Sequence, residues 1–470
     1  MTESVSLPLW VLIVGGILAL WSFLHILVLP SLRWFFRRRT TKVITKIDER
    51  LDLRLPDFKL THRREIINRL VYDSKVQEAM KTLAEEQNIS NADALKKVKK
   101  YADEIVPSFN ALIYFRFGNW LSRAVCRMLY RVRVGFVDEE SFSKFDPESS
   151  VVFIMNHRSN IDYVLLGYLT ISRVALSFAV GEWARVWPLQ HLLRALGGFF
   201  VRRGSGNPLY RRILERYVQM ATEGGVVQAI FPEGKLSKDG RLGPPKIGIL
   251  DYMLRIFDPH KGRDLVFIPV GINYDRVLED RSSLFAIDPD SVKKKKADVV
   301  KTASLYLLKL IRLRLRRGWY RYGYAVVNFG TPISMRMYAE EHKLDFLKLD
   351  KDERIQKVEA LAQNLMTAVG RIVPVVPVAL IASVFLEDIR KSFSELELKS
   401  AVQHKIHKLE EHNAFVYIPR SDRDYAIEVG LRTLILRHIV HEEDDLYRAA
   451  PGETKILRYY ANSIAHLSEW

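Results

Sequence analysis

The stretch that most constrains the fold is residues 151–169, which read VVFIMNHRSNIDYVLLGYL. It opens with an apolar run of the kind that forms a buried strand. A short polar segment ends that run, and residues 161–169 continue with the composition of an apolar helix. The stretch therefore predicts a strand that turns directly into a helix, with His157 and Asp162 at the turn.

His157 and Asp162 have the chemistry of a catalytic pair. A neutral imidazole takes a proton from a hydroxyl near neutral pH. A carboxylate within reach of the other ring nitrogen fixes the tautomer and stabilises the imidazolium. Two plainer readings stay open at this point. Asp162 follows Ser159 by three positions, as in a capping box, and His157 fits an ordinary loop histidine.

Short apolar runs alternate with helical segments from residue 151 to residue 331, which predicts an α/β core with a mostly parallel sheet. The candidate strands are 151–155, 173–179, 198–201, 226–231, 266–272 and 325–329. The candidate helices are 161–169, 187–196, 208–222 and 301–317.

Residues 7–29 form an uncharged apolar run that is long enough to cross a bilayer. Glu3 precedes it, and a cluster of arginines follows it, which places the rest of the chain in the cytoplasm. A buried core helix is the alternative. We expect a single N-terminal transmembrane helix and a single-pass membrane protein, with its active domain on the cytoplasmic side, at the inner membrane if bacterial.

Four regions are expected along the chain. They are a transmembrane anchor (1–34), a helical N-terminal region (35–112), an α/β domain (113–335) and a mainly helical C-terminal domain (336–470).

Composition limits the classes of partner. The 470 residues are 48% hydrophobic, which excludes a disordered chain, and carry a formal net charge of +17. Such a charge indicates a polyanionic partner, either anionic membrane lipids or nucleic acid. Because the positive charge is spread over the chain and no nucleic-acid reader module is visible, we expect no nucleic acid. The single cysteine excludes an internal disulfide, and no metal motif occurs.

Two further stretches combine glycines with cations. Residues 197–203 read GGFFVRR, and their arginines directly follow an apolar strand, where the planar guanidinium suits phosphate. Residues 231–248 read FPEGKLSKDGRLGPPKIG, a loop that glycine and proline keep irregular and that four cations line. The alternative for both is a basic surface. Residues 267–273, FIPVGIN, form a strand with an internal proline, as found at edges and bulges.

These four stretches resemble, in order and separation, the four motif blocks of the glycerolipid acyltransferase superfamily, most closely its glycerol-3-phosphate acyltransferase branch. The blocks are NHRSNID (156–162), GGFFVRR (197–203), FPEGKLSKDGRLGPPK (231–246) and FIPVGINYDRV (267–277). The resemblance continues in 327–334, 374–382 and 457–467 and covers most of residues 115–470.

The resemblance implies transfer of a fatty acyl group from acyl-CoA or acyl carrier protein to the sn-1 hydroxyl of glycerol 3-phosphate, which gives lysophosphatidate. It implies no metal and no cofactor beyond the acyl donor. It assigns His157 as the general base and Asp162 as the residue that holds its tautomer. It assigns Arg202 and Arg203 as phosphate ligands and matches Glu233 and Gly234 to the acidic-glycine pair of the third block. Together with Arg158 and the loop lysines Lys235, Lys238 and Lys246, these are the expected substrate-binding residues.

One position departs from the family pattern. The branch usually has an arginine two residues after the Glu-Gly pair of the third block, where this chain has Leu236. Lysine lacks the guanidinium fork that binds phosphate through two parallel hydrogen bonds. Another acceptor, such as lysophosphatidate, is therefore the alternative to glycerol 3-phosphate.

Overall fold

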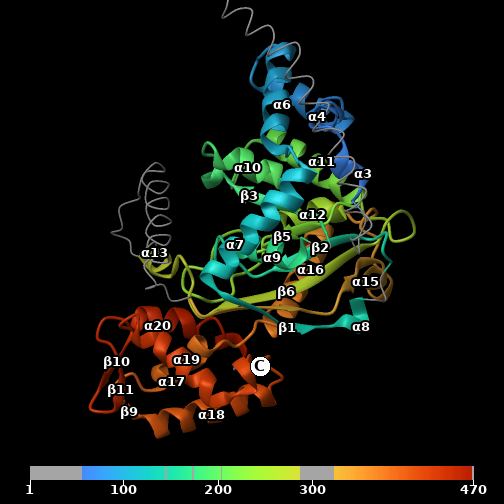
Figure 1. Cartoon of the computed structure of the whole chain (residues 1–470). Helices are drawn as coiled ribbons and strands as arrows, with labels where there is room; N and C mark the ends of the chain where they lie inside the picture. Colours follow the sequence, from blue (N-terminus) through green and yellow to red (C-terminus); the bar gives the residue numbers. More distant parts are fainter. Residues whose placement is uncertain (1–54, 143–145, 172–173, 203, 286–321, 468–470) are drawn as a thin grey trace, which may run out of the picture.

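A mixed sheet forms the centre of the computed structural model, which describes residues 55–142, 146–171, 174–202, 204–285 and 322–467 (Figure 1). Its strands run in the order β1-β7-β6-β2-β5-β3-β4, and β8 also pairs with β6. The strands are β1 (Arg131–Val137), β2 (Ser150–Met155), β3 (Ser177–Gly181), β4 (Gly198–Val201), β5 (Gln228–Ile230), β6 (Leu265–Tyr274), β7 (Tyr324–Phe329) and β8 (Ile333–Ser334).

The sheet is mostly parallel, as expected, but it is mixed, because two of its seven strand pairings are antiparallel. The neighbours from β6 through β2, β5 and β3 to β4 are all parallel, as predicted. On the other edge of β6, both β7 and β8 pair antiparallel to it. β1, which the sequence analysis did not identify, then lies parallel to β7 at the edge. All six candidate strands are present, although β3 begins later than expected.

The two faces of the sheet are covered by different helices, because side chains alternate along a strand. Val151, Phe153 and Met155 of β2 face a core shared with α7 (Asn119–Leu129), α9 (Asp162–Thr170) and the C-terminal helices. Val152 and Ile154 face the opposite core, whose covering helices are α11 (Pro208–Glu223), α12 (Gly248–Leu254) and α16 (Lys351–Arg371). Every residue of β2 is buried, which explains its uninterrupted apolar sequence.

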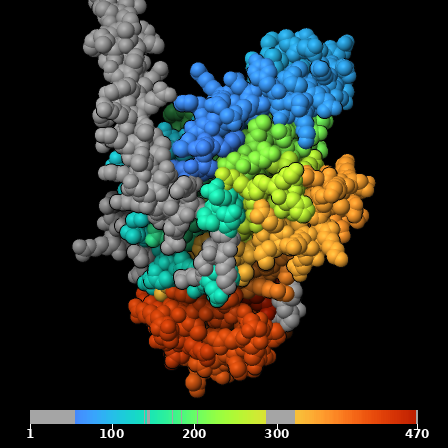
Figure 2. Space-filling model, turned by 90° about the vertical axis from the view of Figure 1, so that its right-hand side faces the viewer, coloured from blue at the N-terminus to red at the C-terminus, as the bar shows by residue number. Residues whose placement is uncertain are grey.

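The N-terminal helices pack on α11 and so extend the second core. They are α3 (Asp57–Leu60), α4 (Arg63–Val71), α5 (Ser74–Glu86) and α6 (Asn91–Ile105). Side chains cap two of them: Asp73 accepts hydrogen bonds from the first turn of α5, and Ser90 accepts one from the first turn of α6. Figure 2 shows these helices, in blue, seated on the green part of the chain that includes α11.

The C-terminal helices form a compact group at the other end of the molecule (Figure 1). α17 (Pro377–Glu387) lies at its centre and packs against α18 (Glu395–Glu411), α19 (Arg423–Ile435) and α20 (Thr454–Ala461). A small antiparallel sheet covers this group. Its strands are β9 (Phe393–Ser394), β10 (Val440–Glu443) and β11 (Leu446–Ala449).

Short helical segments connect these parts. The remaining α-helices of the described residues are α8 (Glu139–Phe142), α10 (Leu189–Ala195), α13 (Asp280–Phe285) and α15 (Met335–Glu341). A π-helix, η2 (Ile113–Gly118), leads into α7, and 3₁₀ turns occupy η3 (Glu182–Ala184), η4 (Pro419–Ser421) and η5 (Ala465–Leu467).

The expected membrane anchor needs a correction. Residues 7–29 lie outside the described residues, as does the candidate helix 301–317. Among the helices that the structure describes, none combines the length and the apolar character that a bilayer crossing requires. The longest of them, α16, exposes a face of charged side chains. The single transmembrane helix and the single-pass localisation are therefore not supported.

Candidate active site

His157 and Asp162 meet at the turn between β2 and α9. The Nδ1 atom of His157 lies 2.9 Å from Oδ2 of Asp162. His157 is 4% exposed and Asp162 is fully buried, so this contact is shielded from bulk water. The pairing engages Nδ1 and leaves Nε2 as the ring nitrogen available to a substrate.

Asp162 is the centre of a dense set of hydrogen bonds. Its Oδ2 also accepts from the backbone N–H groups of Arg158, at 2.8 Å, and Ser159, at 3.0 Å. Its Oδ1 accepts from the hydroxyl of Tyr274, at 2.6 Å. Hydrogen bonds to a carboxylate favour its charged form, so these donors offset the cost of burying Asp162. Burial and the nearby Asp162 charge raise the pKa of Tyr274 well above its usual value, so its phenol remains a neutral donor.

The capping-box reading is half right. The Ser159 N–H does donate to the Asp162 carboxylate, as such a box requires. The Ser159 hydroxyl, however, donates to Glu279 at 2.6 Å and does not serve the N–H of Asp162. Asp162 thus supports the helix start and the histidine together.

Two further carboxylates hold the loop between β2 and α9. Glu233 accepts from the N–H of His157 at 2.8 Å and from the N–H of Gly243 at 2.9 Å, which ties the third motif block to the first. Glu279 accepts from the Ser159 hydroxyl and from both the backbone and side-chain N–H groups of Asn160. Burial raises the pKa of both glutamates. Hydrogen bonds to Glu233 and to Glu279 therefore fix the conformation of this loop.

A cavity of about 410 Å³ opens beside His157. The His157 ring stacks on Phe231, with ring centroids 4.0 Å apart, and Tyr163 meets both rings edge-on. Three cationic side chains also line the cavity: Arg202, Arg211 and Lys246. The arrangement places a proton acceptor next to a positively charged wall.

An apolar cavity of about 130 Å³ adjoins the first. Tyr163 and Val180 line both cavities. The other walls of the second cavity come mainly from η2, α7 and α9 and include Leu121, Val164 and Leu166. Its lining suits a hydrocarbon chain better than a polar group.

The structure brings together only part of the substrate-binding set. Arg202, Gly234 and Lys246 line the larger cavity, and the positive φ of Gly234, 68°, is a conformation that glycine adopts without strain. Lys235 and Lys238 are exposed and are not among the described residues that line it. Arg203 lies outside the described residues.

Glu233 and Arg158 contact other parts of the protein and do not line the cavity. Glu233 holds the His157 loop, as described above. Arg158 is 3% exposed, donates to the carbonyl of Gly240 at 2.5 Å, and lies over the ring of Tyr459 at 4.8 Å. It points toward α20 and links the loop to the C-terminal helices.

Sequence reasoning missed Tyr274, Glu279 and Arg211. Tyr274 lies within the fourth motif block and Glu279 two residues after it, so proximity to that block was the available signal. Their partners lie more than 100 positions away along the chain. Only the pairing of β2 with β6 brings them together.

Comparisons with known proteins agree with this architecture. The model of the Acyltransferase family matches residues 133–273, and the model of the glycerol-3-phosphate acyltransferase C-terminal region matches residues 306–468. The first match contains three motif blocks and residues 267–273 of the fourth, and the second match contains the C-terminal helices α17 to α20.

The curated relatives are also named glycerol-3-phosphate acyltransferase. The chain is 28% identical to a glycerol-3-phosphate acyltransferase of Alteromonas mediterranea and to one of Xanthomonas campestris pv. campestris. Each match covers 87% of this chain but 50% and 47% of those proteins, so the chain spans about half the length of these relatives. A solved 1-acyl-sn-glycerophosphate acyltransferase from Thermotoga maritima is 17% identical over 58% of this chain and 81% of its own, with a TM-score of 0.30. The two family models match in tandem, and together with these relatives they support the resemblance to the glycerol-3-phosphate acyltransferase branch of the glycerolipid acyltransferase superfamily.

Proposed function

We propose that this chain transfers a fatty acyl group from a thioester to the sn-1 hydroxyl of glycerol 3-phosphate and so produces lysophosphatidate. The observation that carries the proposal is the buried His157–Asp162 pair, whose histidine lines a cavity with three cationic side chains. The names of the relatives support the same reaction.

The proposed chemistry uses His157 as a general base. Nε2 accepts the proton of the acceptor hydroxyl as its oxygen attacks the thioester carbonyl carbon. A carbon–oxygen bond forms, the carbon–sulfur bond breaks, and the proton passes from the imidazolium to the departing thiolate. Asp162 stabilises the imidazolium between these steps, and its four donors keep it in place.

The cavity walls support the choice of substrates. Arg202, Arg211 and Lys246 provide positive charge for the phosphate of the acceptor. The adjoining apolar cavity fits the first part of an acyl chain, and we propose acyl-CoA or acyl carrier protein as its donor. No other cofactor is part of this proposal.

We also propose anionic lipid headgroups as partners of η2 and α7. Arg116 and Arg123 are exposed there, beside Phe117 and Trp120, which are 43% and 61% exposed. Cations beside exposed aromatic rings are typical of helices that lie on a lipid surface. Flotation with phosphatidylglycerol vesicles, but not with phosphatidylcholine vesicles, is the expected result. Equal binding to both would contradict the charge argument.

The test of the reaction is product formation by the purified chain. We expect acyl-CoA and radiolabelled glycerol 3-phosphate to give lysophosphatidate acylated at the sn-1 position. Absence of any acylated product with either acyl-CoA or acyl carrier protein as the donor would refute the proposal.

A second acceptor is kept because of Leu236. Leu236 is half-buried and is not among the described residues that line the cavity, so it supplies no ligand for the acceptor phosphate. Offering glycerol 3-phosphate and lysophosphatidate side by side separates the two acceptors. Exclusive formation of phosphatidate would favour lysophosphatidate as the acceptor.

A further inference from the structure

A carboxylate from the N-terminal helices reaches the cationic wall of the active-site cavity. Glu104, near the end of α6, is 4% exposed. Its two oxygens accept from Nε and Nη2 of Arg202, at 2.7 and 2.6 Å, and Oε1 also pairs with Arg185 at 2.7 Å. Glu104 lies outside both regions matched by family models, so neither match assigns it a role.

The Arg202 side chain is fixed on several sides. Its guanidinium lies 5.1 Å from the ring centroids of both Tyr101 and Tyr210. Tyr101 belongs to α6, like Glu104, while Tyr210 belongs to α11. The pair with Glu104 occupies Nε and Nη2 and leaves Nη1 outside it. Because Arg202 lines the cavity, this geometry fixes a guanidinium edge at the cavity wall.

The end of α6 is itself held in place. Arg194 donates to the backbone carbonyls of Asp103 and Glu104, at 3.1 and 3.0 Å. Arg63 pairs with the Asp103 carboxylate at 2.7 Å and donates to the carbonyl of Val106 at 3.1 Å. Cations at a helix C-terminus complement the helix dipole, so the position of Glu104 is well defined.

We infer that Glu104 is a positioning residue that holds Arg202 in place for the phosphate of the acceptor, so that the N-terminal helices complete the acceptor site. This inference rests on the proposed function and deepens it.

Charge balance favours positioning over simple neutralisation. Two guanidinium groups share one carboxylate, so the cluster of Glu104, Arg185 and Arg202 keeps a net positive charge. Without the carboxylate, the two like charges repel each other and leave their present geometry. A phosphate binds best to guanidinium groups that are already in place, because the cost of ordering them has been met during folding.

The test is the Glu104→Gln variant, which keeps the size of the side chain and removes its charge. We expect the KM for glycerol 3-phosphate to rise about tenfold, while kcat falls less than twofold and the KM for acyl-CoA is unchanged. Inorganic phosphate, as a competitive inhibitor, should lose affinity by a similar factor. The shorter Glu104→Asp keeps the charge and should give an intermediate KM; it also serves if the glutamine variant does not fold.

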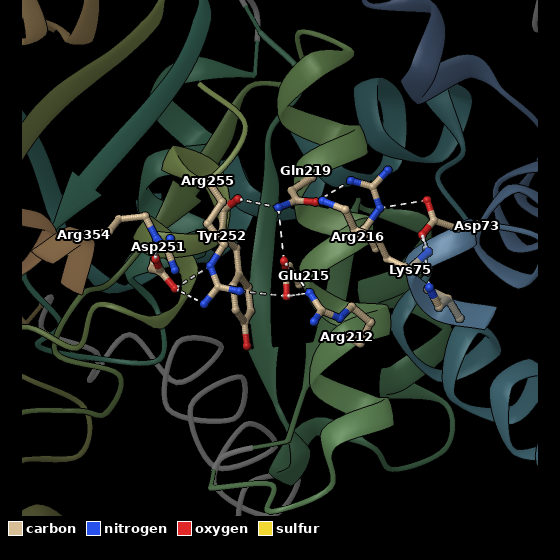
Figure 3. A network of polar contacts seen from close by, with 11 residues as sticks. Asp73, Lys75, Arg212, Glu215, Arg216, Gln219, Asp251, Tyr252, Arg255 and Arg354 are labelled. Atoms are coloured by element: carbon tan, nitrogen blue, oxygen red, sulfur yellow. Dashed lines mark hydrogen bonds and ion pairs between the residues drawn. The ribbon is translucent and has the colours of Figure 1, made fainter. Parts of the chain in front are cut away.

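The matched control is Asp73→Asn. Asp73 pairs with Arg216 at 2.8 Å, which also joins the N-terminal helices to α11 (Figure 3). Arg216 then contacts Gln219, within a network that continues through Glu215 and Arg255. None of these five residues is among those that line the active-site cavity. The control therefore removes a comparable ion pair and should leave the KM for glycerol 3-phosphate as it is.

Three results would overturn the inference. One is an unchanged KM in Glu104→Gln, and another is a lowered KM, which would mean that Glu104 competes with the phosphate. The third is an equal rise in Asp73→Asn, which would indicate general loosening of the N-terminal helices. If the wild type transfers no acyl group, the proposed function fails by itself. Calorimetric binding of inorganic phosphate to wild type and Glu104→Gln then still tests the inference.

Discussion

Replacing Tyr274 with phenylalanine removes one hydroxyl from the core of the site. That hydroxyl donates to Oδ1 of Asp162 at 2.6 Å and is the only donor to this oxygen among the described residues. Asp162 is fully buried, so water does not readily replace the lost partner. A hydrogen bond to a buried charged group contributes about 2 kcal/mol. We therefore expect Tyr274→Phe to lower the free energy of unfolding by about that amount and Tm by roughly 4 °C.

The same change should move the pH dependence of catalysis. With one donor fewer, the negative charge of Asp162 is less dispersed and stabilises the imidazolium of His157 more strongly. The acid limb of the pH profile of kcat/KM should then shift upward by about one pH unit. The charged neighbours Glu233, Glu279 and Arg158 are unchanged by this substitution. The assay is the initial rate of acyl transfer between pH 5 and pH 9.

Tyr130→Phe is the matched control. The Tyr130 hydroxyl is also buried, but it donates to the carbonyl of Arg276 at 2.8 Å and does not contact Asp162. Its ring packs against that of Tyr274, with centroids 5.2 Å apart. This control should lose stability and keep the wild-type acid limb. An unshifted limb in Tyr274→Phe, or an equal shift in both variants, would refute the reasoning.

Three other changes test separate parts of the account. Glu279→Gln should lower kcat about tenfold with little effect on the KM for glycerol 3-phosphate, because it weakens the hold on Ser159 and Asn160; steady-state kinetics measure this. Cys126 is buried with its pKa raised to about 12, so alkylation at pH 8 should be slow in the native protein and fast in urea, as mass spectrometry would show. Burial raises the pKa of Asp275 to about 6 from 3.8. The folded state therefore binds the proton more tightly, and this stabilisation is complete below pH 4 and lost as the pH rises through 6. Urea unfolding should show that the wild type is about 3 kcal/mol less stable at pH 7 than below pH 4, once the pH dependence of Asp275→Asn has been subtracted. Equal pH dependence of the two proteins would contradict this.

The sequence predicted the features that depend on local pattern. The buried β2 strand, the turn at His157 and the start of α9 lie within one short stretch, so apolar runs and helix-start residues were sufficient to find them. The parallel strands from β6 to β4 followed from the alternation of strands and helices. The antiparallel return of β7 along β6 did not, because no local pattern encodes which edge a strand joins.

The candidate site shows the same division. The contact between His157 and Asp162 spans five positions and is local. The residues that hold this pair are distant in sequence: Tyr274 is 112 positions from Asp162, and Glu279 is 120 positions from Ser159. Glu104 is 98 positions from Arg202 and belongs to a helix whose sequence shows only ordinary amphipathic character. Such partners become visible only when the sheet and the N-terminal helices are assembled.

The most direct measurement of the central claim is the rate of acyl transfer to glycerol 3-phosphate by His157→Ala, compared with the wild type. Protection of Cys126 from alkylation would show that the variant keeps the packing of α7 against α9. We predict a loss of roughly 10³-fold in kcat/KM, since the substitution removes the general base. Transfer within tenfold of the wild-type rate by the folded variant would contradict the account.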